Sequence, residues 1–311
     1  MTDPQADAVP PEAATSGAAT SHPAAADAPA QTAHAWRPGR FMVITAHPDD
    51  AEFGPAATAA SWVDQGSVGW LVCCTSGDQG GEDPEQDPLE LAALREREQR
   101  AAAEIIGYAG VTFLHQPDGA LENTLALREL LVREIRSFRP DAVLATDPEV
   151  LFYGDGGVNH SDHRAAGMAA VDAVYPAARN PMAFPWLTRE GLAKHVVRRL
   201  YLFWSNQPTA RIDVTATIDR KIAALRAHES QLRDPERVER WIRGWAEDEG
   251  KAIGSTAAEA LRVIVIEDDE SEGPAGPEVE SAEGAAAAAE SGVEAFDERA
   301  ASPAGSGAGE Q

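Results

Sequence analysis

Residues able to do chemistry are concentrated in a short stretch, AHPDDAE, at positions 46–52. His47 and Asp50 are three positions apart, so on a helical turn both side chains can reach one point, while Asp49 is directed elsewhere. Imidazole nitrogen and carboxylate oxygen together suit zinc or a similar divalent ion such as Fe²⁺. A catalytic zinc site has three protein ligands and one open position, so a third ligand must come from elsewhere.

The best candidate for that ligand lies in a second stretch, NHSDHRAAG, at positions 159–167. His160 and His163 are again three apart, and Ser161 is the predicted N-cap of a helix that begins near Asp162. If His163 completes the ligand set, His160 lies beside the ion without binding it. Asp and His near helix starts often bond to backbone without doing chemistry. Two such stretches, each beyond a predicted strand of one sheet, favour the metal site over that alternative.

The elements that position these residues alternate between strands and helices. Four mostly apolar runs are typical of strands covered on both faces, namely FMVITA (41–46), VGWLVCCT (68–75), VTFL (111–114) and AVLAT (142–146). The segments between them have apolar residues at helical spacing, and two of these segments end at Gly66 and Gly107. This order predicts an α/β domain with a mostly parallel sheet and helices on both faces, in which ligands bind beyond the carboxyl ends of the strands.

Farther along the chain, RRLYLFW and RIDVT read as strands, two helical patterns follow, and AEALRVIVIE reads as a last strand. Trp241 and Trp245 are four apart on one face of the second helix, which could pack against the domain or against a second subunit. Trp186 could stack on a sugar ring or fill a subunit contact, although core packing is the commoner fate of a tryptophan.

Composition restricts the class of protein. The formal charge of −25 argues against nucleic acid or an anionic membrane surface as the main partner. The ends are rich in Ala, Pro, Gly, Ser and Glu, which predicts disordered tails at 1–35 and 267–311 around a single domain at 36–266. A basic segment followed by an apolar one is missing from the amino-terminal tail, and no run of 18 apolar residues occurs, so a cytoplasmic enzyme is expected. Cys73 and Cys74 are adjacent, and buried packing is a better interpretation than a disulfide.

Three other features could be functional. His115 follows a predicted strand near the cleft, but a lone histidine is more often a hydrogen-bonded structural group. His228, in the predicted helix LRAHESQ, has no ligand partner three or four positions away, and structure and cleft lining are equally good interpretations. The loop at 75–87 has three glycines and five acids but no basic residue to meet a phosphate, which favours a mobile loop over the cleft.

The two histidine stretches resemble the signature motifs of the LmbE-like, or PIG-L, family of zinc-dependent N-acetylglucosamine deacetylases. The resemblance spans roughly residues 41–233 and includes RERE (95–98), PDG (117–119) and IDRKIAALRAHESQ (218–231) in the family's order. It implies a Rossmann-like three-layer fold and a role for each matching residue. The zinc ligands are His47, Asp50 and His163, the general base is Asp49, the oxyanion-stabilising histidine is His160, a substrate-contacting arginine is Arg95, and a polar residue at the cleft rim is Asp118.

Two departures from the family pattern affect this expectation. Ser161 replaces a proline common at that point, and Val158 stands where some members carry a tyrosine, although Tyr153 in the same loop could serve instead. Either Asp49 or His160 could protonate the leaving amine.

The expected function is therefore metal-dependent removal of an acyl group from a small N-acetylglucosamine-type amide. The alternatives are a conjugate amidase acting on a sugar-linked thiol and a non-catalytic sugar- or nucleotide-binding domain. No G-x-G-x-x-G follows the first strand, which argues against nucleotide binding.

Overall fold

The computed structural model describes residues 34–267. The predicted tails, 1–35 and 267–311, lie outside the described residues except at their inner edges. At the first edge, the ring of His34 lies 2.9 Å from the Tyr201 hydroxyl. The packed domain thus already includes His34, two residues before the predicted boundary.

Nine strands are present among the described residues. They are β1 (Arg40–Thr45), β2 (Val68–Thr75), β3 (Gly110–Gln116), β4 (Ala142–Thr146), β5 (Phe152–Tyr153), β6 (Gly157–Val158), β7 (Arg199–Phe203), β8 (Ala210–Asp213) and β9 (Ala258–Val265). The strand predictions for β2 and β4 are confirmed to the residue, and the others agree to within a few positions.

Helices connect these strands. They are α1 (Asp50–Phe53), α2 (Ala56–Asp64), α3 (Pro88–Ile106), α4 (Leu125–Phe138), α5 (Ser161–Asp172), the segment η1 (Ala173–Ala178), which is kinked at Tyr175, α6 (Pro185–Arg189), α7 (Ile218–Leu225) and α8 (Pro235–Lys251). Gly107 ends α3 with a left-handed φ of 95°, as the sequence predicts, because glycine adopts this conformation without steric cost. Helix α7 ends at Leu225, so His228 lies in the turn after this helix rather than within it.

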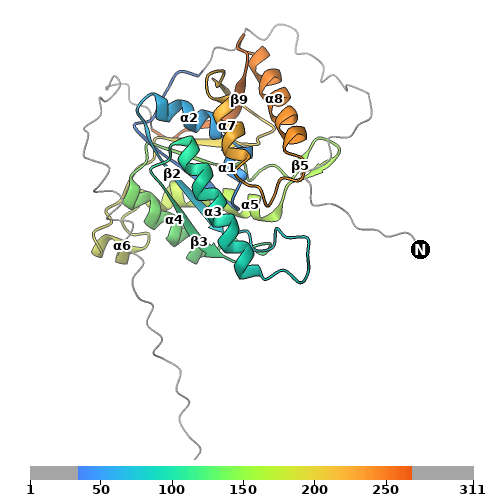
Figure 1. The fold of residues 1–311 in the computed structure, drawn as a ribbon. Helices are drawn as coiled ribbons and strands as arrows, with labels where there is room; N and C mark the ends of the chain where they lie inside the picture. The colour runs from blue at the N-terminus through green and yellow to red at the C-terminus, as the bar shows by residue number, and fades with distance from the viewer. Residues whose placement is uncertain (1–33, 268–311) are drawn as a thin grey trace, which may run out of the picture. The chain divides into compact units, whose positions relative to one another are not determined.

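Seven strands form one sheet in the order β3-β2-β1-β4-β7-β9-β8 (Figure 1). β3, β2, β1, β4 and β7 are parallel, whereas β9 runs antiparallel to both β7 and β8. The chain leaves β1 toward β2 on one side and later returns to β4 on the other side. The carboxyl ends of β1 and β4 therefore flank the topological switch point, where open α/β sheets bind their ligands.

The sheet lies between two apolar layers. Alternate residues of the strands point to opposite faces, so Phe41 and Val43 pack with α2, α3, α7 and α8, while Met42 and Ile44 pack with α4, α5, η1 and α6 (Figure 1). Cys73 belongs to the first layer and Cys74 to the second, and both are free and buried. The predicted packing role of this pair is confirmed. Among residues 34–267, no helix is both long enough and apolar enough to cross a membrane.

Candidate metal centre

The loop after β1 folds back on itself through Asp50. The Asp50 Oδ2 atom accepts the backbone N–H groups of Ala46, at 3.1 Å, and His47, at 2.9 Å. Asp50 is the first residue of α1 and is 3% exposed, so its carboxylate is fixed below the end of the strand. Asp49 precedes it with φ 88°, a left-handed conformation that is uncommon for a residue other than glycine and often occurs at functional sites.

The second histidine pair is positioned by α5. This helix begins at Ser161, and its N-cap is His160, whose Nδ1 accepts the N–H of Asp162 at 3.2 Å. The prediction of Ser161 as N-cap was wrong, because the imidazole one residue earlier accepts that N–H. Gly167 lets α5 approach the end of β4, since a Cβ there would lie 2.3 Å from the Thr146 carbonyl oxygen. The first turn of α5 is thus held against the switch point.

These two loops bring the three predicted ligands together. The Asp50 carboxylate lies between the histidines, with Oδ2 3.6 Å from His47 Nδ1 and Oδ1 3.0 Å from His163 Nε2. The rings of His47 and His163 are 5.2 Å apart between centroids. His160 joins this cluster, because one ring nitrogen each of His47, His160 and His163 lie within 4.8 Å of one another.

Hydrogen bonds at the far side of each ring indicate which nitrogen faces the cluster. His47 Nε2 lies 3.1 Å from Asp118 Oδ1, which needs a donor, so the Nδ1 lone pair points toward Asp50. His163 Nδ1 lies 3.3 Å from Asn159 Oδ1, which leaves its Nε2 lone pair toward Asp50. His160 differs, because its Nδ1 is already an acceptor, so the neutral ring carries its proton on Nε2. His160 is therefore suited to donate a hydrogen bond rather than to bind a metal.

A second group of potential ligands contains His47, Asp118 and Asp162. Asp162 is fully buried and accepts the backbone N–H groups of Gly119, at 2.8 Å, and Leu121, at 3.3 Å. Asp118 accepts the N–H groups of Gln79 and Gly119. Both carboxylates point at the same atom, His47 Nε2. This arrangement orients a ligand imidazole, as is usual behind metal-binding histidines, and does not constitute a separate centre.

Arg95 lies directly under Asp49. It is 4% exposed, and its guanidinium donates to the carbonyl oxygens of Pro48, at 2.8 Å, and Gly77, at 2.9 Å, and lies 3.4 Å from Asp49 Oδ2. Asp118 is equally buried. Direct contact of either residue with a substrate therefore stays a prediction. Their observed partners indicate that Arg95 positions Asp49 and that Asp118 positions His47.

A buried chain of hydrogen bonds supports Asp49 from the other side. Gln99 accepts the Asp49 N–H at 2.8 Å and donates to both carboxylate oxygens of Glu52 at 3.1 Å. Glu52 Oε2 in turn lies 3.1 Å from His228 Nε2. Glu52, Gln99 and His228 are all 0% exposed. Of the two interpretations left open for His228, the structural one is confirmed, since the ring does not line the cleft. Neither Gln99 nor Glu52 is among the predicted site residues, although Glu52 lies within the AHPDDAE stretch.

The pKa values of Asp49, Asp118 and His160 are shifted in different directions by their surroundings. Burial raises the pKa of the Asp49 carboxyl, and the positive charge of Arg95 opposes this shift. For Asp118, burial acts in the same direction, but hydrogen bonds from His47 and the Gln79 N–H outweigh it and bring the pKa to about 2. Burial, together with His47 and His163, lowers the pKa of His160. This lowered pKa favours the neutral form of His160.

His115 and Tyr153 are two further residues for which the sequence allows a functional role. His115 Nδ1 lies 3.0 Å from Ser76 Oγ and 3.3 Å from Glu96, which agrees with the predicted hydrogen-bonded structural role. The Tyr153 hydroxyl is buried and has no hydrogen-bond partner among the described residues. Burial, with smaller contributions from Asp50 and Asp147, raises the pKa of this phenol.

The donor set fits a divalent metal ion. The lone pairs of His47 Nδ1 and His163 Nε2 face the Asp50 carboxylate from two loops, and the contacts of the other ring nitrogens with Asp118 and Asn159 fix the direction of each ring. Zinc takes such nitrogen and oxygen ligands with a fourth position open. The fold and the site together define an α/β protein of Rossmann-like topology with a candidate metal site at the switch point of its sheet.

Known proteins are similar to this chain in sequence and in fold. Residues 42–174 match the PIG-L family, described as GlcNAc-PI de-N-acetylase. Diacetylchitobiose deacetylase from Thermococcus kodakarensis is 31% identical over 233 residues, covering 72% of this chain and 83% of that protein. The 1D-myo-inositol 2-acetamido-2-deoxy-alpha-D-glucopyranoside deacetylase of Mycobacterium sp. (strain KMS) is 28% identical, covering 62% and 74%. The structure of N,N'-diacetylchitobiose deacetylase from Pyrococcus horikoshii superimposes with a TM-score of 0.68 at 28% identity, covering 73% and 84%. The chain belongs to the PIG-L family.

Proposed function

We propose that this chain is a metal-dependent deacetylase that removes the acetyl group from an N-acetylglucosamine-type amide. One observation carries the proposal, namely that the Asp50 carboxylate lies between His47 and His163 at the switch point of the sheet, with His160 beside His47 and with Asp49 next to Asp50 in the chain. The activities named for the family and for its relatives agree with this chemistry. We propose zinc as the ion, with Fe²⁺ as the alternative.

His47 Nδ1, Asp50 and His163 Nε2 would hold the ion. The ion would supply a Lewis acid that lowers the pKa of water, so that hydroxide is available as the nucleophile near neutral pH. Asp49 takes the proton of the attacking water, and Arg95 and Gln99 hold its carboxylate and its backbone in place. His160 Nε2–H donates a hydrogen bond to the amide oxygen as negative charge develops there. The proton held by Asp49 can then pass to the leaving amine.

Acetate release provides a direct test. The purified full-length protein is incubated with N-acetylglucosamine, N,N'-diacetylchitobiose and an acyl conjugate of a glucosamine-linked thiol, before and after removal of metal by a chelator. We expect acetate from the first two compounds, loss of activity in the chelated protein, and recovery on addition of Zn²⁺ or Fe²⁺. Cleavage of the thiol conjugate alone would instead identify a conjugate amidase. Binding of these compounds without any turnover would contradict an enzymatic role.

The ligand set has its own test. His163→Ala should lose bound metal, measured by elemental analysis, while the circular dichroism of the fold is retained, because the sheet is built without the ion. The matched control is His115→Ala, since this histidine bonds to Ser76 and Glu96 outside the ligand set and should leave metal content unchanged. Full metal occupancy in His163→Ala would exclude the proposed ligands.

A further inference from the structure

The Gln99 amide joins the backbone of Asp49 to the carboxylate of Glu52. Gln99 Oε1 accepts the Asp49 N–H at 2.8 Å, and Gln99 Nε2 donates to both Glu52 oxygens at 3.1 Å. A backbone N–H can only donate, so the Gln99 atom that faces it must be the carbonyl oxygen. The amide therefore has one orientation in which both of its ends are satisfied.

This orientation matters because the backbone of Asp49 is strained. Asp49 has a φ of 88°, a region that residues other than glycine rarely adopt. The contact of its carboxylate with Arg95 is long, at 3.4 Å, whereas the bond of its N–H to Gln99 measures 2.8 Å. The bond to Gln99 is the shorter of these two contacts, and it holds the backbone from which the carboxylate extends.

Glu52 accepts hydrogen bonds from two side chains in a fully buried position. His228 Nε2 lies 3.1 Å from Glu52 Oε2, and a carboxylate oxygen accepts, so Nε2 carries the imidazole proton. Burial lowers the pKa of His228, but the hydrogen bond and the charge of Glu52 outweigh it and raise this pKa. Both Glu52 oxygens thus act as acceptors, and Gln99 turns its NH₂ group toward them.

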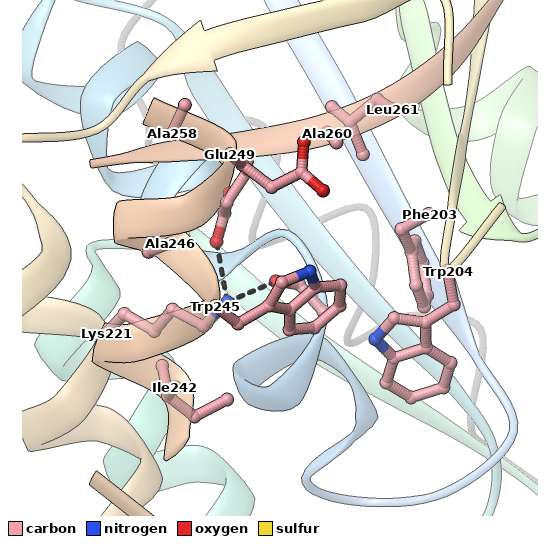
Figure 2. Close-up of a pocket in the computed structure, with 12 residues that line it drawn as sticks. Phe203, Trp204, Lys221, Ile242, Trp245, Ala246, Glu249, Ala258, Ala260 and Leu261 are labelled. Carbon is pink, nitrogen blue, oxygen red and sulfur yellow. Dashed lines mark hydrogen bonds and ion pairs between the residues drawn. The ribbon is translucent and has the colours of Figure 1, made fainter. Parts of the chain in front are cut away.

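Another buried glutamate, Glu259, is stabilised in a different way. Its carboxylate forms an ion pair with Lys221 at 2.7 Å (Figure 2). Glu52 instead has Gln99 and His228 as its partners in the described part of the chain. Loss of the charge at Glu52 would therefore act on the direction of an amide and on the proton of an imidazole, not on an ion pair with lysine.

We propose that Glu52 is a positioning residue for the reaction, because its carboxylate fixes the direction of the Gln99 amide and Gln99 then holds the base Asp49 in place. Glu52 is 0% exposed and acts through Gln99, without contact with the substrate. This inference rests on the proposed function for the role of Asp49 as the base. The hydrogen bonds that carry the inference do not depend on the metal.

The variants Glu52→Gln and Glu52→Met distinguish this role from simple packing. Because Gln99 Nε2 lies 3.1 Å from both Glu52 oxygens, an amide at position 52 places an NH₂ group against it in either orientation. Two donors then face each other, which favours rotation of the Gln99 amide and removes the acceptor of the Asp49 N–H. Methionine offers no opposing donor, so Gln99 can keep its oxygen toward Asp49. The isosteric glutamine should therefore disturb Asp49 more than methionine does, the reverse of what packing alone predicts.

Hydrogen exchange of the Asp49 amide, followed by NMR in the full-length protein, measures this bond without any turnover. We expect exchange to be about 10-fold faster in Glu52→Gln and at most about 3-fold faster in Glu52→Met, as loss of one hydrogen bond predicts. In the metal-loaded protein, kcat for acetate release from N,N'-diacetylchitobiose should fall about 10- to 100-fold in Glu52→Gln, with KM within about 2-fold and metal content unchanged.

A double variant and a control complete the experiment. Glu52→Gln with Gln99→Glu should return exchange and kcat toward those of the unaltered protein, because the donor and the acceptor have changed places and the Asp49 N–H again faces an oxygen. Glu98→Gln is the matched control, because Glu98 is a buried glutamate that bonds to Ser230 instead of Gln99. This control should change neither the exchange of the Asp49 amide nor kcat.

The outcomes separate the two proposals. Exchange in the expected order in a protein that releases no acetate would overturn the proposed function and retain Glu52 as the residue that orients Gln99. Unchanged exchange in Glu52→Gln, exchange at least as fast in Glu52→Met, or no recovery in a folded double variant would overturn the role of Glu52. Exchange in the expected order with unchanged kcat would also overturn it, because the amide would then not position the base. If the double variant does not fold, the order of the two single variants still decides.

Discussion

Replacing each of the adjacent aspartates Asp49 and Asp50 by asparagine should have different effects, the first on turnover and the second on metal binding. Asp49→Asn keeps an oxygen near Arg95, now 3.4 Å from Asp49 Oδ2, and leaves the backbone bond to Gln99 untouched, so the side chain should stay in place. The amide cannot accept the proton of water. We expect kcat to fall by about 10² to 10⁴, which corresponds to about 3 to 5 kcal/mol, with metal content unchanged.

Asp50→Asn should first lose metal. The amide oxygen can still accept the two backbone N–H groups that Asp50 Oδ2 now accepts, so the fold should lose at most about 1 kcal/mol. The amide NH₂ would then stand 3.0 Å from His163 Nε2, where the carboxylate oxygen is now, and the charged ligand is gone. Added zinc should partly restore this variant and should not restore Asp49→Asn.

Metal content, thermal unfolding and turnover, measured for both variants, distinguish a base and a metal ligand from two residues that only cap a helix. If the two aspartates served only to cap α1, each change would cost about 1 kcal/mol of stability and little activity. The Asp49 side chain makes no capping hydrogen bond, which already disfavours that view. An Asp49→Asn protein that turns over normally, or that loses its metal, would refute the assignment of the base.

Three further predictions follow from contacts outside the ligand set. Lys221→Met should lower the free energy of unfolding, measured by urea denaturation, by about 3 to 5 kcal/mol, because it leaves the Glu259 carboxylate buried without the lysine of its ion pair. The double variant Lys221→Met with Glu259→Gln should recover part of this loss. Gln99→Met removes the acceptor of the Asp49 N–H and two donors to Glu52, so we expect a loss of about 2 to 4 kcal/mol and a lower kcat at unchanged metal content. Burial raises the pKa of Glu134, so the ionised carboxylate opposes folding once the pH rises above the usual pKa range of glutamate. Glu134→Gln should therefore stabilise the protein at pH 8 and not at pH 4, and urea unfolding at both pH values measures this difference.

Short-range patterns in the sequence were sufficient to predict the framework. Apolar runs bounded by turn residues predict β2 and β4 to the residue, and apolar spacing predicts a helix between β3 and β4, where α4 lies, because strand and helix periods are local properties. The order of these elements predicts the parallel part of the sheet, since parallel neighbours need a helical crossover. The rule that ligands bind at the carboxyl ends of parallel strands then places His47 and His163 at one edge.

Local patterns could not predict which side chains lie behind the site. Arg95 and Asp118 are predicted substrate contacts, and this prediction stands untested; the structure adds that Arg95 lies against Asp49 and Asp118 against His47, and that both are buried. Spacing along one helix shows which residues share a face, but not which loop packs over that face. Gly77 illustrates this point, because a Cβ there would lie 2.3 Å from the Arg95 guanidinium, a contact between segments 18 positions apart.

Contacts between distant segments also decided how the site is supported and what surrounds it. His228 reaches Glu52 across 176 positions of sequence, and Trp204 meets His163 only because β7 lies beside β4 in the sheet. The sequence determined the residue types and the end of the sheet at which the chemistry occurs, since these depend on local spacing and strand order. The tertiary structure alone determined the direction of each imidazole lone pair and the packing of Trp204 against His163, since both depend on hydrogen bonds and packing between segments that are far apart in the chain.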